Sequence, residues 1–323
     1  MLAPVSNTHQ NAGWGKLRHP ETGFAHLKPA LVFAVRHRGF SVKPKAANFF
    51  ALSLLLSIAS LSYGDETIRI LYNFHTAHNG APSPVGLLAV DRSGNLYGVQ
   101  ERGGAYNKGA VYELAKDLSG NWVQIILHSF TGEADGETPF AGVTLDNDGN
   151  IYGTSLDGRV NGQSFCGESV GCGVVFELRK INGAWQFTVL HTFVGYQDGV
   201  VPAATLTLYQ GRIYGTTQWG GGTGGDWGEG CGTVFELSPS NLAASWNEQV
   251  IYRFLCGGTA PVLPVSNVVF DAHGNLFSVT RFGGTGGGDG GCGAAFELSP
   301  PQPRIQNLEW KLSECLRLHL RGR

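Results

Sequence analysis

Short runs of alternating apolar and polar residues dominate the chain after residue 64. Between residues 204 and 254 these runs are ATLTLY, RIYGTTQW, GTVFELS and WNEQVIYRF. Each is rich in β-branched and aromatic residues and is bounded by turn-forming residues, as is typical of strands joined by tight turns. No segment of this region shows the apolar period of a helix. The pattern therefore predicts an all-β protein.

The same runs recur four times, at intervals of about 60 residues, and three motifs mark each copy. The motifs are LYNF, LHSF, LHTF and IYRF (71–74, 127–130, 190–193, 251–254), then GNLYG, GNIYG, GRIYG and GNLFS (94–98, 149–153, 211–215, 274–278), then VYEL, VFEL, VFEL and AFEL (111–114, 175–178, 234–237, 295–298). Four short strands in each copy match one blade of a β-propeller, whose faces are buried only by neighbouring blades. We predict a β-propeller-like array of four-stranded repeats over residues 65–311. A four-bladed ring and an incomplete part of a larger ring both remain open.

The first 64 residues have a different composition. Seven lysines and arginines oppose one glutamate before residue 48, and an apolar run of thirteen residues follows at 49–61. This run is shorter than the 18 or so residues that span a bilayer, which favours a signal peptide cleaved near Gly64. A short buried strand or helix is the alternative. We therefore predict an N-terminal extension and signal peptide at 1–64, a secreted, periplasmic or cell-surface location, and no membrane span in the mature chain.

Charge and motif spacing argue against several partners and cofactors. The formal net charge is −2 and the repeats carry no basic stripe, which argues against nucleic acid. No C-x-x-C pair points to zinc, and no Lys-Ser or Lys-Thr follows the glycine-rich loops as a phosphate site requires. The loop GGTGGD at 221–226 begins like a calcium-binding repeat but occurs once. We predict no cofactor and no metal site, with incidental calcium at a loop as the alternative to a structural turn.

Six cysteines follow residue 64, in keeping with an oxidising compartment. Three of them occupy one repeat position, four residues before a phenylalanine, and equivalent positions on neighbouring blades lie too far apart for a disulfide. Each should therefore pair locally. We predict the disulfides Cys166–Cys172 and Cys231–Cys256, and leave the pairing of Cys292 and Cys315 open.

The combined motifs resemble the GloVer tandem repeat of exported bacterial proteins. Matching features are Asp135-Gly136 with Pro139, Asp198-Gly199 with Pro202, the turn-and-strand motif at 149–154, the strand at 232–237 and the Trp246-to-Phe254 strand. The resemblance covers residues 70 to 310 and implies export and a repeat fold, without an established activity. Two departures stand out: GGTAPVLP replaces the Asp-Gly opening of the fourth unit, and Leu318 stands where phenylalanine should follow Trp310. This loss of register predicts an irregular tail at 312–323 and leaves truncation or a frameshift open.

Residues that recur at one repeat position are more readily explained by a structural role than by catalysis. His128 and His191 occupy one repeat position, and most carboxylates recur in the same way, so we assign no catalytic residue. Unrepeated residues gather instead in the third glycine-rich loop: Trp219, Asp226, Trp227 and Glu229. Tryptophans beside acids suit a sugar or peptide ligand. Packing over the glycine backbone is the alternative role.

These observations favour an exported binding or interaction module for an extracellular glycan or protein over an enzyme. The alternative is a propeller-type lyase or glycosidase that acts on extracellular polysaccharide. Such an enzyme should contain one unrepeated acid/base cluster with perturbed pKa values. A binding module should instead present aromatic loops on one face.

Overall fold

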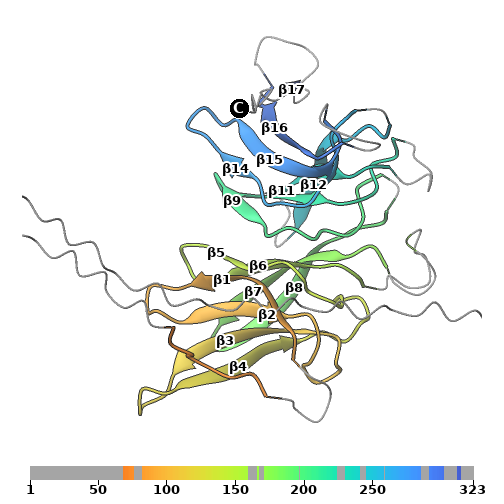
Figure 1. Cartoon of the computed structure of the whole chain (residues 1–323). Coiled ribbons are helices and arrows are strands. Elements are labelled where there is room, and N and C mark those ends of the chain that lie inside the picture. Colours follow the sequence, from red (N-terminus) through yellow and green to blue (C-terminus); the bar gives the residue numbers. More distant parts are fainter. Residues whose placement is uncertain are drawn as a thin grey trace, which may run out of the picture. The chain divides into compact units, whose positions relative to one another are not determined.

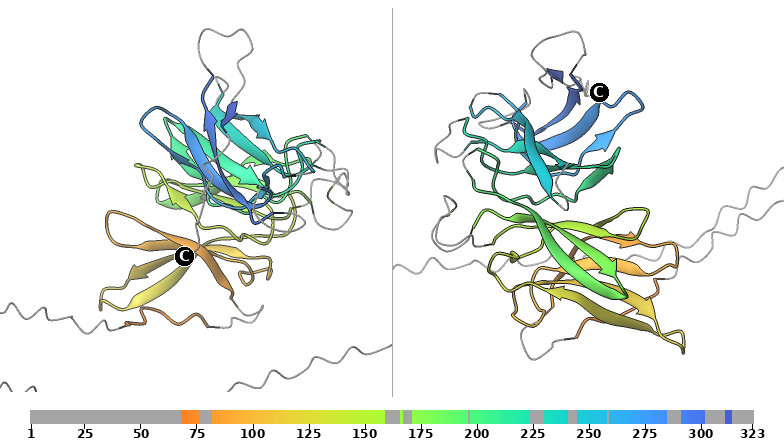
Figure 2. Two further views of the ribbon diagram at one scale, coloured as in Figure 1. Left: turned by 45° about the horizontal axis from the view of Figure 1, so that its top comes forward. Right: turned by 180° about the vertical axis from the view of Figure 1, so that it is seen from behind.

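The fold is that of a computed structural model, which describes residues 68–75, 82–158, 166, 171–195, 197–223, 230–240, 245–257, 259–284, 291–301 and 311–313. The predicted signal peptide lies outside these residues. All described elements are strands, arranged in four antiparallel sheets that form the four blades of a β-propeller (Figures 1 and 2). The predicted fold class is thereby confirmed. None of the described residues forms a helix that could cross a membrane.

Each blade follows the order of the sequence. Blade 1 contains β1 (Pro84–Val90), β2 (Leu96–Gln100), β3 (Ala110–Lys116) and β4 (Trp122–Ser129). Blade 2 contains β5 (Thr144–Leu145), β6 (Ile151–Ser155), β7 (Val174–Ile181) and β8 (Ala184–Thr192). Blade 3 contains β9 (Thr207–Tyr209), β10 (Arg212–Thr217), β11 (Thr233–Pro239) and β12 (Trp246–Arg253). Blade 4 contains β13 (Val262–Pro264), β14 (Val269–Phe270), β15 (Leu276–Phe282), β16 (Ala294–Ser299) and β17 (Lys311–Ser313), and both β13 and β14 pair with β15.

The turn between the first two strands is an Asx turn in blades 1, 2 and 4. In blade 2, Asp146 Oδ1 accepts hydrogen bonds from the backbone N–H groups of Asp148 and Asn150, both at 2.9 Å. Gly149 follows with a φ of +84°, a conformation that favours glycine. Blade 3 has a shorter turn, in which Gln210 and Gly211 have φ values of +50° and +75°. This difference shapes the site described below.

The core lies between consecutive blades. Three buried clusters join blade 1 to 2, blade 2 to 3 and blade 3 to 4. At each junction a phenylalanine at the end of the earlier blade meets a phenylalanine of the later blade edge to face. The pairs are Phe130–Phe176, Phe193–Phe235 and Phe254–Phe296, with ring centroids 5.4, 5.2 and 5.1 Å apart. A Cβ at Gly153 would come within 2.5 Å of the Phe176 ring, which explains the glycine of the recurring Tyr-Gly pair.

The two predicted disulfides are present. Cys166 is bonded to Cys172 and Cys231 to Cys256, each with a Cα–Cα distance of 5.4 Å. Cys292 is exposed and forms no disulfide with any described residue, and Cys315 lies outside the described part. The local pairing inferred from the repeat geometry is therefore confirmed.

The last strand of the fourth blade ends later in the sequence than predicted. Strand β17 keeps the register of the repeat, with Leu298 opposite Leu312 and Glu297 opposite Ser313. The paired strand thus continues two residues into the segment at 312–323 that was expected to be irregular. The remainder of that tail, including Leu318, lies outside the described residues.

Candidate functional site

The loop residues that the sequence singles out are only partly described. Trp219 has a relative exposure of 36%. Its backbone forms two hydrogen bonds with the backbone of Val200, at 2.9 and 3.1 Å. Asp226, Trp227 and Glu229 lie outside the described residues. Their role in ligand binding stays a prediction.

A pocket that the sequence reasoning missed lies at the opposite end of the strands, between blades 2 and 3. Its volume is about 430 Å³, within the usual range for small-molecule sites of roughly 300–1,000 Å³. The walls come from the first turn and second strand of each blade and from the start of β12. The lining includes Asp146, Tyr152, Tyr209, Arg212 and Trp246.

This pocket reflects a departure from the repeat. Blades 1, 2 and 4 have an aspartate and an asparagine at the two ends of the turn, whereas blade 3 has Tyr209 and Arg212 on a turn one residue shorter. Tyr209 is held in place by parallel stacking on Phe270 of blade 4, with ring centroids 4.0 Å apart. The substitution of these two residues was visible in the sequence. That the shorter turn leaves a concave space against blade 2 was not.

The charged and hydroxyl groups around the pocket are fixed by short contacts. Arg212 forms an ion pair with Glu236, and its side chain remains about half exposed. The Tyr152 hydroxyl lies 2.9 Å from Glu177 Oε1 and 3.2 Å from Asp146 Oδ2. Burial, together with these two carboxylates, raises the pKa of Tyr152 well above its usual value. The hydroxyl therefore stays protonated and acts as a donor.

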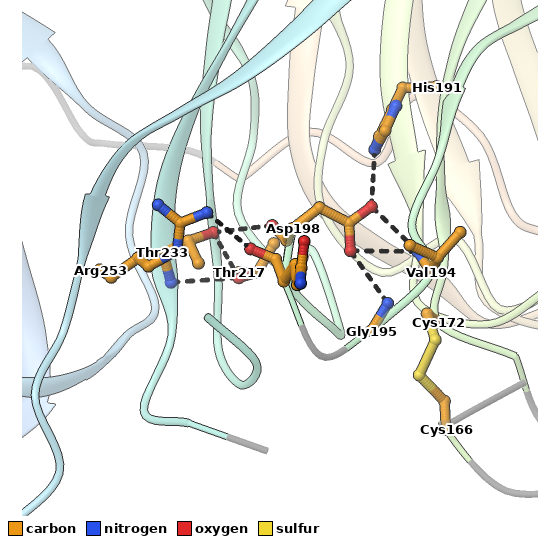
Figure 3. Close-up of polar contacts among 10 residues, drawn as sticks. Cys166, Cys172, His191, Val194, Gly195, Asp198, Thr217, Thr233 and Arg253 are labelled. Carbon is orange, nitrogen blue, oxygen red and sulfur yellow. Dashed lines mark hydrogen bonds and ion pairs between the residues drawn. A yellow bond between two sulfur atoms is a disulfide. The ribbon is translucent and has the colours of Figure 1, made fainter. Parts of the chain in front are cut away.

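The histidines are held in repeated structural contacts. His128 Nε2 lies 3.1 Å from Asp135, and His191 Nε2 lies 3.2 Å from Asp198 (Figure 3). Asp198 also accepts hydrogen bonds from the backbone N–H groups of Val194 and Gly195. Although burial opposes ionisation, these hydrogen bonds keep the pKa of Asp198 below its usual value. Such a contact ties the end of one blade to the loop that enters the next, which supports the predicted structural role.

The threonines of this region extend the same network. Thr217 and Thr233 share a hydrogen bond of 2.8 Å between their hydroxyls, and Thr233 Oγ1 donates to the backbone carbonyl of Asp198 (Figure 3). Arg253 donates to the carbonyl of Gln197 at 3.1 Å. The Asp198 loop is therefore anchored to blade 3 as well as to His191 of blade 2.

One unrepeated acid/base cluster lies at the junction of blades 1 and 2. Lys108 forms an ion pair with Glu137, whose backbone forms two hydrogen bonds with that of Asp157. Burial and the nearby charge of Glu137 raise the pKa of Asp157 to about 6. The sequence already indicated that this junction is unusual, because Lys108 stands where the later units have cysteine. Among the described residues no three His, Cys, Asp or Glu side chains gather as a metal site would require.

The chain matches a protein family and is distantly similar to solved structures. The periplasmic gluconolactonase of Pseudomonas aeruginosa is 14% identical, with a TM-score of 0.40, over 77% of this chain and 61% of that one. A protein of unknown function from Dyadobacter fermentans is 13% identical (TM-score 0.36; 67% and 64%), and a xylan β-1,4-xylosidase from Bacillus halodurans is 14% identical (TM-score 0.40; 72% and 44%). This chain thus spans less than two thirds of the length of each.

No curated protein matches the chain. The model of the Gloeobacter/Verrucomicrobia repeat matches residues 57–286, which is more than half of the sequence and includes all of blades 1 to 3. The resemblance inferred from the motifs is therefore confirmed. The chain belongs to the Gloeobacter/Verrucomicrobia repeat family.

Proposed function

We propose that the protein is an exported binding module that holds a neutral saccharide in the pocket between blades 2 and 3. The observation that carries the proposal is the combination, at one junction, of aromatic side chains with hydrogen-bonding groups around a pocket of suitable size. The unrepeated residues Tyr209 and Arg212 supply part of this combination. A binding site is expected to depart from the repeat, whereas packing residues should follow it.

The aromatic residues suit the apolar faces of sugar rings. Trp246 and Tyr209 line the pocket, and Tyr209 is already stacked on Phe270. An aromatic ring whose orientation is fixed before binding loses little conformational entropy when a ligand arrives. Tryptophan and tyrosine also combine a large apolar surface with a polar edge, as recognition of a hydroxylated ring requires.

The charge of the pocket favours a neutral ligand over an anion. Arg212 is paired with Glu236, and Asp146 adds a further carboxylate, so negative charge slightly exceeds positive charge. Carboxylates accept hydrogen bonds from hydroxyl groups, and the five N–H donors of an arginine are not exhausted by one ion pair. Sugar hydroxyls can thus donate to the acids and accept from the guanidinium.

Titration calorimetry of the full chain against a set of neutral oligosaccharides tests this proposal. Trp246→Ala should weaken binding by at least about tenfold, because it removes an aromatic face worth roughly 1.4 kcal/mol or more. Trp122→Ala is the matched control, since Trp122 occupies the same repeat position on blade 1, away from the pocket. Equal weakening by both variants, or loss of binding with Trp219→Ala alone, would move the site away from this pocket.

A propeller-type lyase or glycosidase is the second candidate function, and the cluster of Lys108, Glu137 and Asp157 favours it. An aspartate whose pKa is raised to about 6, close to a glutamate, has the composition of an acid/base pair. Incubation of the chain with polysaccharides, followed by analysis of reducing ends, tests this candidate. Activity that is abolished by Asp157→Asn and unaffected by Trp246→Ala would establish it in place of simple binding.

Export is part of the same proposal. It rests on the basic N-terminal region, the apolar run at 49–61 and the two disulfides, which form in oxidising compartments. N-terminal sequencing of the protein from culture medium or periplasm should find a new terminus close to Asp65. Recovery of intact Met1 from the cytosol would contradict export.

A further inference from the structure

Every blade has two different faces, and each junction joins the same two. The face toward the following blade, here called the leading face, contributes Tyr97, Val99 and Val111 in blade 1. The face toward the preceding blade, here called the trailing face, contributes Val143, Ile151 and Phe176 in blade 2. The equivalent positions of the later blades form the clusters of the other two junctions.

On the trailing face of blade 1 the first strand lacks the cover that it receives in the other three blades, whereas Tyr112 of the third strand is buried. Leu88 has a relative exposure of 50%, whereas the residues at its repeat position are Val143 at 3%, Leu206 at 3% and Val268 at 0%. Val90 and Leu87, on the same strand, are exposed as well. These positions stay apolar, so their exposure does not reflect a change to polar residues, and in the described part of the chain no blade packs against them.

The leading face of blade 4 is open in the same way. Val279 has a relative exposure of 43%, whereas its equivalents are Val99 at 0%, Thr154 at 1% and Thr216 at 1%. Ala295 is exposed, although its equivalents Val111, Val175 and Val234 are fully buried. Among the described residues no core cluster joins blade 4 to blade 1.

The segment at 68–75 already represents part of a preceding blade. Phe74 stands at the repeat position of Phe130, and its ring lies 5.2 Å from that of Tyr112, which is the edge-to-face contact of the three internal junctions. Ile68 and Ile70 of this segment are exposed. Strand β17 pairs only with Glu297–Ser299, so in the described part no fourth strand covers Ala294–Phe296.

We infer that two copies of this chain join into one eight-bladed ring, with blade 4 of each copy packed against blade 1 of the other. The two open faces have the positions and apolar character of the faces that meet inside the chain, so a second copy supplies both missing neighbours at once. A two-fold axis makes the two new junctions equivalent. Eight blades lie within the range of known propellers, roughly 4–8.

In the proposed dimer, the segment at 70–73 of one copy adds a strand to blade 4 of the other copy. Its register follows from the strand pairing inside blade 1. In blade 1, His128 pairs with Val111 and Ser129 with Ala110. By the same rule, Tyr72 of one copy should lie opposite Ala295 of the other, and Asn73 opposite Ala294. The segment at 70–73 would then complete β16 beyond the point where β17 ends.

Sedimentation velocity of the full chain across a range of concentrations tests the inference. We expect a species of twice the chain mass. Leu88→Asp and Val279→Asp should each raise the dimer dissociation constant about 100-fold, because a carboxylate would be buried without a partner. Leu118→Asp is the control, since Leu118 is fully exposed in the turn after β3. It should leave the dimer unchanged.

Mixing the two interface variants gives a sharper test. A mixture of Leu88→Asp and Val279→Asp chains retains one unaltered junction, between the blade 1 that carries Leu88 and the blade 4 that carries Val279. Such a mixture should recover a mixed dimer that neither variant forms alone.

Three outcomes would overturn the inference. The first is a monomer at all concentrations, which would mean that no second copy covers the open faces of blades 1 and 4. The second is a ladder of larger oligomers, which would mean that the junctions form without closing a ring. The third is a dimer that survives both substitutions, which would place its interface elsewhere. None of these measurements involves a saccharide, so they are independent of the proposed binding function.

Discussion

The junctions between blades 1 and 2 and between blades 2 and 3 share a backbone and differ in side-chain chemistry. At the first, the N–H of Thr138 donates to the carbonyl of Lys108 at 2.9 Å, and at the second, that of Val201 donates to the carbonyl of Cys172 at 3.2 Å. Thr138 and Val201 also share a positive φ, of 56° and 60°, which is rare for β-branched residues. The backbone path is thus common to both.

The side chains around this path differ between the two junctions at three repeat positions. Lys108, Glu137 and Asp157 at the first junction stand at the repeat positions of Cys172, Val200 and Trp219 at the second. Around this path, the first junction therefore contains an ion pair and a half-buried aspartate with a raised pKa, and the second contains a disulfide and apolar packing. The same backbone path thus accommodates different side-chain chemistry, while both junctions keep the phenylalanine core.

The largest effect should come from that shared core. Phe176→Ala and Phe235→Ala each remove a fully buried ring and should lower the free energy of unfolding by about 3–5 kcal/mol. Chemical denaturation checks this, with Phe140→Ala, an exposed phenylalanine, as a control expected to cost about 1 kcal/mol or less. Very unequal losses at the two junctions would contradict a common core.

The disulfides should contribute less, and in proportion to the loops that they close. Cys166–Cys172 spans 6 residues and Cys231–Cys256 spans 25. Loop-closure entropy predicts about 2 kcal/mol for the first and about 3.5 kcal/mol for the second. Denaturation of Cys→Ser pairs at each site measures both. A larger loss from the 6-residue loop would show that this disulfide acts through native packing.

The charged junction should make stability depend on pH. Folded Asp157 keeps its proton up to about pH 6, whereas an unfolded aspartate loses it near 3.8, so the folded state binds more protons between these values. The contribution of Asp157 to the free energy of unfolding should therefore fall as pH rises from about 4 to about 6, by on the order of 1 kcal/mol. Asp157→Asn should abolish that part of the pH profile. An unchanged profile would show that Asp157 is not buried in this way.

The smallest effect should follow removal of the lysine. Lys108 is 43% exposed in its side chain, so its ion pair with Glu137 should contribute no more than about 1 kcal/mol. Its positive charge also lowers the pKa of Asp157, so Lys108→Gln should move the pH-dependent step of Asp157 upward. Comparison of the two pH profiles checks this. A downward movement would mean that Lys108 does not interact with Asp157.

Much of the fold could be predicted because each local sequence pattern occurs in four copies. The motifs at 94–98, 149–153 and 274–278 specify a turn and a strand, and the recurring phenylalanines specify where blades meet. Repetition likewise indicated that Cys166–Cys172 and Cys231–Cys256 pair locally, because equivalent cysteines on adjacent blades are too far apart. Local chemistry and periodicity were sufficient for these conclusions.

The candidate sites depended on contacts between blades, which no local rule contains. The sequence shows that Tyr209 and Arg212 break the pattern, yet only the packing of blade 3 on blade 2 brings them beside Asp146. In the same way, Lys108, Glu137 and Asp157 are separated along the chain and become a cluster with a shifted pKa only when the entry loop of blade 2 crosses the end of blade 1. Secondary structure follows from nearest neighbours along the chain, whereas burial and charge at a site follow from neighbours in space.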